Sequence, residues 1–337
     1  MHGEKLNLCV DLYGCPNRCL HCWLGHMPNR AMPVGADGEI AAYFAPYFDK
    51  IEFYSWLREP DFCADYRARW EKDKALSKNC APERFELASF WRIVRDPEYI
   101  PFLREVGVKK VQLTLFGLRE TQDRYIGRRG AYDEVLTATR ALIAGGIVPR
   151  WQCFINEENK DEIVQVYRLA QKFMEECPEF EFFVHEGSCE GENEKLYPIR
   201  IEEGHIPEEL RPVYLDISRL KTERACVELL QNDQSCPTFP LVGEITLYVS
   251  NSFDVFYNFT HMRTPWAIGN LKNEQPAELL RRVFTGDTFA LRAANGTTWA
   301  ALANRYGDRS SMRLFSLEDY QAFILNRYLE ELWSNTH

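Results

Sequence analysis

The sequence predicts an α/β fold: a partial (β/α)6 barrel followed by a smaller α+β region with a β-hairpin. Strand-like and helix-like segments alternate over roughly the first 190 residues, which implies parallel strands joined by crossover helices. No G-x-G-x-x-G follows the first strand-like run, so a dinucleotide-binding sheet loses its main support. The length of 337 residues allows one domain of barrel size or two ordinary ones. We therefore predict a barrel at 1–190 and a C-terminal cap with terminal helices at 191–337.

Six runs of β-branched, aromatic and alternating apolar residues predict the strands. They are residues 5–13, 51–57, 84–91, 108–117, 147–156 and 179–186. Apolar spacing of three and four predicts helices between them, at 63–77, 131–146 and 159–176. Asn159 stands at the start of the last helix, where it can serve as the N-cap.

The pattern changes after residue 190. An acidic, proline-bearing stretch at 190–212 reads as a linker or an irregular cap. Two β-rich runs around "SNS" predict a hairpin at 243–259. An amphipathic helix is expected at 316–333, because Ser316 followed three residues later by Asp319 has the form of a capping box.

Composition excludes several function classes. The formal net charge of −10 argues against nucleic acid as a partner, because phosphate binding needs clustered Lys and Arg. No apolar stretch approaches the roughly 18 residues of a membrane span, and the N-terminus lacks a secretory pattern. We therefore expect a cytoplasmic protein without a membrane partner. The 11 cysteines are then expected to be reduced, as free thiols or metal ligands.

The most informative stretch is "YGCPNRCLHCWLGH" at 13–26, which places Cys15, Cys19 and Cys22 in a C-x3-C-x2-C pattern. It follows the first predicted strand, at the end where barrels of parallel strands carry their active sites. A closed zinc site wants four ligands, whereas three thiolates suit a [4Fe–4S] cluster with one iron left open. The alternative is half of a zinc site or three incidental thiols.

This motif resembles the signature of the radical SAM superfamily, which carries C-x3-C-x2-C after the first strand of a partial (β/α)6 barrel. The resemblance implies two cofactors, a [4Fe–4S] cluster and S-adenosylmethionine (SAM). It implies that the reduced cluster cleaves SAM to a 5′-deoxyadenosyl radical, which abstracts a hydrogen atom, with the protein positioning the reactants. It also implies a reductase of the flavodoxin or ferredoxin type as electron donor.

Further positions fit that resemblance. "WLREP" ends the second predicted strand, so Glu59 and Pro60 match a family Gly-Gly-Glu-Pro element that binds the SAM amino group, while Leu57 and Arg58 replace its glycines. Thr114 stands where the family has a ribose-binding Ser. The candidate SAM-binding residues are His21, Arg58, Glu59, Ser89, Gln112, Thr114, Arg124, Arg128, Arg150 and Asn156.

These candidates come from two kinds of reasoning. His21 takes the place of a family aromatic near the adenine, and a family Arg aligns with Arg124, Arg128 or Arg129. Alternation places Ser89, Gln112, Thr114, Arg150, Gln152 and Asn156 on polar inner faces of their strands. Such faces are unusual for parallel strands, and the alternative is a buried network in which these polar side chains pair with one another.

The C-terminal region resembles the SPASM or Twitch region of that superfamily, which carries extra clusters. Cys236 and Ile268–Gly269–Asn270 keep its outline, but Asn258 stands where a cysteine belongs, and only Cys189, Cys226 and Cys236 remain nearby. A lost extra cluster favours a redox-neutral reaction: rearrangement, epimerisation or coupling. The candidate residues for the chemistry are Cys153, as a hydrogen-atom donor with Cys9 and Cys189 as alternatives, and His185 at the end of the last predicted strand.

The predicted function is that of a radical SAM enzyme acting on a small biosynthetic molecule, amino-acid or sugar-like. No separate domain is recognisable before the first strand, which favours a small molecule over a ribosomal peptide, although maturation of such a peptide is an alternative. A non-catalytic metal-binding protein is the alternative from another class.

Overall fold

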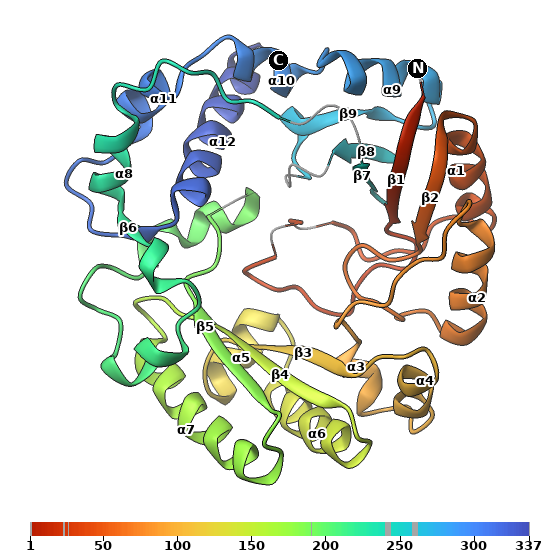
Figure 1. Ribbon diagram of the computed structural model, residues 1–337, viewed down its shortest axis with the longest axis vertical. Coiled ribbons are helices and arrows are strands. Elements are labelled where there is room, and N and C mark those ends of the chain that lie inside the picture. Colours follow the sequence, from red (N-terminus) through yellow and green to blue (C-terminus); the bar gives the residue numbers. More distant parts are fainter. Residues whose placement is uncertain are drawn as a thin grey trace.

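The computed structural model describes residues 2–22, 24–25, 27–189, 191–239, 244–257 and 262–336. Figure 1 shows an open ring in which the strands lie on the inside and most of the helices on the outside. The segment that follows the first strand crosses the middle of this ring. The predicted α/β architecture is therefore confirmed.

The first strands form one edge of the ring. β1 (Gly3–Val10) pairs in parallel with β2 (Phe48–Tyr54). Leu6, Leu8 and Val10 are fully buried on the outer face of β1, in a core shared with α1 (Ala36–Phe44). Two further elements flank β2: the 3-10 turn η1 (Ala45–Tyr47) and α2 (Tyr66–Leu76).

A second parallel sheet lies across the ring, in the order β3 (Lys110–Leu115), β4 (Val148–Phe154) and β5 (Glu181–His185). Its helices are α5 (Arg119–Ile126), α6 (Ala131–Ala144) and α7 (Lys160–Glu176). The strand alternation works as predicted on β3, because Val111, Leu113 and Leu115 are buried in the outer core. The other face of β3 carries Gln112 and Thr114, which line the interior.

The prediction of a strand at 84–91 is wrong. Residues 84–89 are irregular, and α3 (Phe90–Ile93) begins where the strand was expected to end. The Ser89 side chain accepts a hydrogen bond from the Arg92 amide and caps this helix, so side-chain capping overrides the β-propensity of the run. One backbone bond, Gln112 N to Glu86 O at 2.7 Å, still holds the segment beside β3. α4 (Tyr99–Glu105) follows.

The hairpin predicted at 243–259 is confirmed in the described residues and extends the first sheet. β7 (Glu244–Val249) pairs in parallel with β1, and β8 (Asp254–Tyr257) and β9 (Ala267–Asn270) continue antiparallel. The sheet order is β2-β1-β7-β8-β9. Gly243, Asn258 and Phe259, which belong to the predicted hairpin, lie outside the described residues.

Helices fill the rest of the C-terminal region. They are α8 (Glu223–Leu230), α9 (Pro276–Thr285), α10 (Phe289–Asn295), α11 (Trp299–Tyr306) and α12 (Leu317–Thr336). The short elements are η2 (Gly191–Ile199), η3 (Glu208–Val213), η4 (Ile217–Arg219), η5 (Thr264–Trp266) and the antiparallel pair β6 (Lys221–Thr222) and β10 (Leu314–Phe315).

Two predicted caps have different outcomes. Ser316 accepts from the Asp319 amide at 3.1 Å at the start of α12, as expected. Asn159 makes no cap bond to α7, because its amide group instead accepts from Asn156 N and donates to the Phe116 and Phe154 carbonyls. Within the described part of the chain, no helix combines the length and apolar character that a membrane crossing requires.

Candidate functional site

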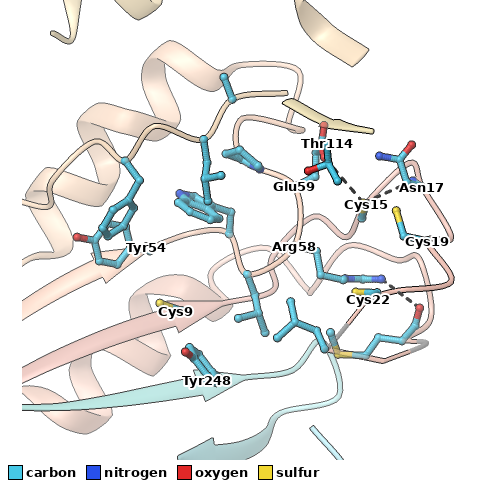
Figure 2. A pocket seen from close by; sticks show the side chains of 18 of the residues that line it. Cys9, Cys15, Asn17, Cys19, Cys22, Tyr54, Arg58, Glu59, Thr114 and Tyr248 are labelled. Atoms are coloured by element: carbon cyan, nitrogen blue, oxygen red, sulfur yellow. Dashed lines mark hydrogen bonds between the residues drawn. The ribbon is translucent and has the colours of Figure 1, made fainter. Parts of the chain in front are cut away.

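A cavity of about 980 Å³ opens inside the ring, between the first sheet and β3. Its size is at the upper end of the range of about 300–1,000 Å³ that is common for ligand pockets. Inner-face side chains of four strands line it: Lys5, Asn7 and Cys9 on β1, Glu52 and Tyr54 on β2, Gln112 and Thr114 on β3, and Glu244, Thr246 and Tyr248 on β7. Cys15, Cys19 and Cys22 complete one end of the lining (Figure 2).

The loop that carries the three cysteines is docked on the C-terminal end of α5. Arg18 N donates to Ile126 O at 2.9 Å, and Leu20 N donates to Tyr125 O at 2.7 Å. Gly127 allows this approach, since a Cβ there would lie 2.7 Å from the Arg18 carbonyl oxygen, and its φ of +70° suits glycine. The loop therefore presents its cysteines to the cavity rather than to solvent.

Burial raises the pKa of all three thiols. The pKa of Cys19 rises to about 12, and those of Cys15 and Cys22 also rise. The Arg58 guanidinium opposes this for Cys15 and Cys22. Since a cysteine binds metal as the thiolate, metal binding at this loop must release protons.

The residues present fit an iron–sulfur cluster. In the described residues, no three His, Cys, Asp or Glu side chains gather closely enough to bind one metal ion. A single zinc would draw each sulfur to about 2.3 Å, whereas a [4Fe–4S] cluster spreads its cysteines over separate irons. Beside the cysteines, the buried Nδ1 atom of His21 has no partner among the described residues, so a polar atom at the site is left for a bound molecule.

Glu59 lies next to this loop. It is buried, with Oε2 4.0 Å from Cys15 Sγ and Oε1 accepting from the Ser89 hydroxyl. Burial raises the pKa of Glu59 to about 7, opposed by the Ser89 bond. Ser89 is thus turned toward Glu59 and α3, and it supports the carboxylate rather than lining the cavity.

Arg58 also lies beside the cysteines, but its guanidinium is engaged. It donates to both carboxylate oxygens of Asp11, at 3.2 and 2.8 Å, and to the carbonyls of Met27 and Pro28, each at 3.1 Å. These bonds use most of its donors, so its position indicates a role in holding the loop.

Polar side chains on the inner faces of β3, β4 and β5 form a chain of contacts. Arg150 Nη2 donates to Gln112 Oε1 at 2.8 Å and pairs with Glu86 at 2.5 Å. Gln112 in turn donates to Gln152, which contacts His185 Nε2. These polar side chains therefore pair with one another, as the alternative for these residues proposed, in a network that is only partly buried. Gln112 is its one member that lines the cavity among the described residues.

Both histidines contact the ring of Phe154. His21 contacts the rings of Phe116 and Phe154, with centroids 4.2 and 4.9 Å away. The His185 ring also contacts Phe154, with the two ring centroids 4.4 Å apart. Burial lowers the pKa of His21 to about 3 and that of His185 to about 4. Both rings are therefore neutral at physiological pH, and His21 is among the residues that line the cavity.

Arg124 and Arg128 lie outside the cavity lining. Arg124 is exposed and pairs with Glu158 at 3.2 Å. Arg128 donates to Asn17 Oδ1 at 3.0 Å and so braces the cysteine loop.

Asn156 lies outside the lining as well. It is buried, donates to the Tyr125 hydroxyl at 2.8 Å and closes the turn before α7 by accepting from Glu158 N. Its amide is therefore engaged within the protein.

The cysteines proposed for hydrogen-atom transfer lie in different surroundings. Cys153 is fully buried in the apolar core on the outer face of β4, so it does not face the cavity. Cys189 is buried beside Arg200, with Nη1 3.1 Å from Sγ. Cys9 does line the cavity, and Figure 2 shows it on the side of the pocket away from Cys19.

Tyr54 and Tyr248 are cavity residues that sequence reasoning missed. They are the register partners of Cys9 on β2 and β7. Tyr54 could have been found from the alternation of its strand. Tyr248 joins the site only because β7 pairs with β1, for which the sequence carries no local signal.

The remaining cysteines of the C-terminal region lie in other surroundings. Cys189 and Cys226 are buried in a core with α12, and Cys236 contacts the Asn295 carbonyl. Asn258 lies outside the described residues.

Comparisons with known proteins identify a family model and two partial relatives. Residues 10–170 match the sequence model of the radical SAM superfamily. The chain is 32% identical over 88 residues to Fe-coproporphyrin III synthase of Methanosarcina barkeri, covering 26% of this chain and 22% of that protein. It is 38% identical over 72 residues to GTP 3′,8-cyclase of Moorella thermoacetica, covering 21% of this chain and 22% of that protein. These matches thus span about a fifth of the curated relatives.

In fold, the chain is similar to native anSMEcpe solved with bound S-adenosylmethionine and a peptide. The TM-score is 0.52 at 13% identity, covering 99% of this chain and all of that chain. This likeness concerns the fold, including the region after the barrel. The family assignment rests on the matched segment of 161 residues: residues 10–170 form a radical SAM domain, and enzymes of that superfamily use a [4Fe–4S] cluster and S-adenosylmethionine as cofactors.

Proposed function

We propose that this protein cleaves SAM reductively and uses the resulting radical on a small biosynthetic substrate, with a redox-neutral outcome. The observation that carries the proposal is the meeting of Cys15, Cys19 and Cys22 with Glu59 and Thr114 at one end of a single large cavity. The remaining length of that cavity, along β1, β2 and β7, is free to take a second molecule beside SAM.

The three cysteines would hold the cluster, with its fourth iron open to SAM. Bound there, the cluster supplies the electron that splits SAM into methionine and a 5′-deoxyadenosyl radical, which abstracts a hydrogen atom from the substrate. A flavodoxin or ferredoxin type reductase is the proposed electron source.

The protein's own groups bind and orient. Glu59, held by Ser89, can accept hydrogen bonds from the SAM ammonium. Thr114 and Gln112 project from β3 into the cavity and can bond a ribose hydroxyl. His21, neutral and in tilted contact with the Phe116 ring, can offer a flat face to a purine. In this proposal the cavity wall around Cys9 contacts the substrate.

A redox-neutral outcome is supported by the placement of Cys9. An epimerisation or rearrangement needs a group that returns a hydrogen atom to the substrate radical, and a protonated thiol can do so. Burial and the Glu52 carboxylate raise the pKa of Cys9 to about 12, which keeps its proton in place at neutral pH. Cys9 replaces Cys153 as our candidate for this role, because it lies in the cavity.

A short peptide is the second candidate substrate. Native anSMEcpe, whose fold is similar to that of this chain, was solved with a bound peptide. In this chain Phe85 and Leu87 are exposed and also line the cavity, so the apolar lining continues to its mouth, where part of a longer substrate could lie.

The test is anaerobic reconstitution with iron and sulfide, reduction with dithionite, and measurement of 5′-deoxyadenosine and methionine formed from SAM. Equal amounts of both products are expected from the wild type. Glu59→Gln should retain its iron and lose most of this cleavage, because it weakens the hold on SAM. A reconstituted wild type that binds a cluster but leaves SAM intact would contradict the proposal.

A further inference from the structure

Arg58 is the most unusual residue near the cysteines. It occupies a position where the resemblance to the superfamily places a glycine, yet its side chain is only 7% exposed and its partner Asp11 only 1%. Its guanidinium bonds both oxygens of Asp11 and two backbone carbonyls, those of Met27 and Pro28. A fork of this kind can bridge four acceptors at fixed angles, which a lysine cannot do.

The acceptors belong to the two ends of the cysteine loop. Asp11 directly follows β1, and Met27 and Pro28 follow Cys22 by only a few residues. Arg58 reaches them from the loop after β2, so it joins three segments at one point. Figure 2 shows its side chain running alongside Cys22.

Other hydrogen bonds hold the same two ends of the cysteine loop. Asn29 Oδ1 accepts from Cys15 N at 2.8 Å, Met32 N donates to Leu12 O at 2.9 Å, and Asn251 donates to Pro28 O at 2.6 Å. Gly14 shows how closely these two ends pack, because a Cβ there would lie 2.2 Å from Asn29 Oδ1 and 3.2 Å from Arg58 Nη2. Unlike these bonds, the contact of Arg58 with Asp11 is an ion pair between two buried charged side chains.

We infer that Arg58 is a positioning residue that clamps the two ends of the cysteine loop, so that retention of the cluster in this chain depends on the buried Arg58–Asp11 pair. The inference rests on the proposed function only in taking Cys15, Cys19 and Cys22 as the cluster ligands. A glycine at 58 would leave Asp11 buried without a counter-ion and two carbonyls without donors, a costly arrangement that opening of the loop relieves.

The test compares Arg58→Gly with a matched variant, Arg84→Gly. Arg84 also forms a buried two-bond pair, with Asp61, at 3.2 and 2.7 Å, and both side chains are 7% exposed. In the part of the chain that the structure describes, no hydrogen bond or ion pair joins Arg84 to the cysteine loop. It therefore controls for the general effect of removing a buried arginine.

Iron release to a ferrous chelator is followed anaerobically on the reconstituted proteins. We expect Arg58→Gly to release iron at least about tenfold faster than both the wild type and Arg84→Gly, as loss of a buried ion pair allows. Millimolar guanidinium chloride, well below denaturing concentrations, should slow the release from Arg58→Gly and leave Arg84→Gly unchanged. Equal release rates for the two variants, or no effect of guanidinium on Arg58→Gly, would overturn the inference.

Hydrogen exchange on the metal-free proteins separates this inference from the proposed function. Backbone amides of residues 12–32 should exchange faster in Arg58→Gly than in the wild type, with Arg58→Lys in between, whether or not a cluster is ever bound. Unchanged exchange in this segment would refute the clamp. A wild type that binds no cluster would refute the proposed function and the role of the pair in cluster retention, while faster exchange in Arg58→Gly would still support the clamp on the loop.

Discussion

Arg200 provides a quantitative prediction on the link between the barrel and the C-terminal region. Its side chain is 2% exposed and pairs with Asp319 of α12 at 2.5 Å. It also donates to the Gly187 and Leu314 carbonyls and lies over the Phe315 ring, with its Cζ 3.9 Å from the centroid. It thus connects the end of β5 to β10 and α12.

Replacing Arg200 by Met keeps much of the volume and removes the charge, so Asp319 is left buried without a counter-ion. Breaking a buried pair in this way costs about 3–5 kcal/mol, a large part of the roughly 5–15 kcal/mol that stabilises a typical domain. The double variant Arg200→Met/Asp319→Leu should recover part of the loss, because both charges are then gone.

The control is an exposed pair with the same fork geometry. Arg168 bonds both carboxylate oxygens of Glu209, and the two side chains are 59% and 49% exposed. Arg168→Met should therefore cost less than about 1 kcal/mol. Urea unfolding of the metal-free proteins, followed by circular dichroism, gives the free energies. If Arg200→Met costs no more than Arg168→Met, the coupling of barrel and C-terminal region through Arg200 is refuted.

Three further predictions concern the cavity and its surroundings. Cys9→Ala should retain SAM cleavage but block product formation when it is assayed with a substrate. Cys153→Ala should leave turnover unchanged and lower only the unfolding free energy. Equal turnover in both variants would exclude Cys9 as the hydrogen-atom donor. Folding lowers the pKa of His185 from 6.5 to about 4, so the stability tied to its neutral form is complete above pH 6.5 and is lost as the pH falls toward 4. In urea titrations, the unfolding free energy of the wild type should therefore fall by about 3 kcal/mol more than that of His185→Gln over this pH range. Equal losses in the two proteins would contradict this prediction. Glu59→Gln should weaken SAM binding about tenfold in equilibrium dialysis with the iron content unchanged, and wild-type affinity would remove Glu59 from the SAM site.

The sequence predicted those parts of the fold that local patterns determine. Alternation along Lys110–Leu115 separates an outer apolar face from an inner polar one, and the structure confirms both. The run at 84–91 has the same local appearance, but Ser89 there caps a helix and bonds Glu59. The cap is a contact between neighbours in sequence that competes with the strand pattern, whereas the bond to Glu59 joins residues 30 positions apart and no local window contains it.

The site was predicted to a similar degree. The cysteine loop is a local motif, and its placement at the end of β1 follows from the barrel. The partners of long polar side chains could not be predicted, because Arg58 meets Asp11 and Arg150 meets Glu86 only after distant segments fold together. The pairing of β7 with β1, which brings Tyr248 into the cavity, is nonlocal in the same way.

The central claim is that Cys15, Cys19 and Cys22 hold one [4Fe–4S] cluster, and the most direct measurement is iron and sulfide counting. The comparison is between the anaerobically reconstituted wild type, a triple Ala variant of these cysteines, and a triple Ala variant of Cys80, Cys177 and Cys236, which are partly buried like the first three. The wild type and the second variant should each carry about four irons and four sulfides, and the first variant none. A wild type that binds a single zinc, or a first variant that retains its iron, would contradict the claim.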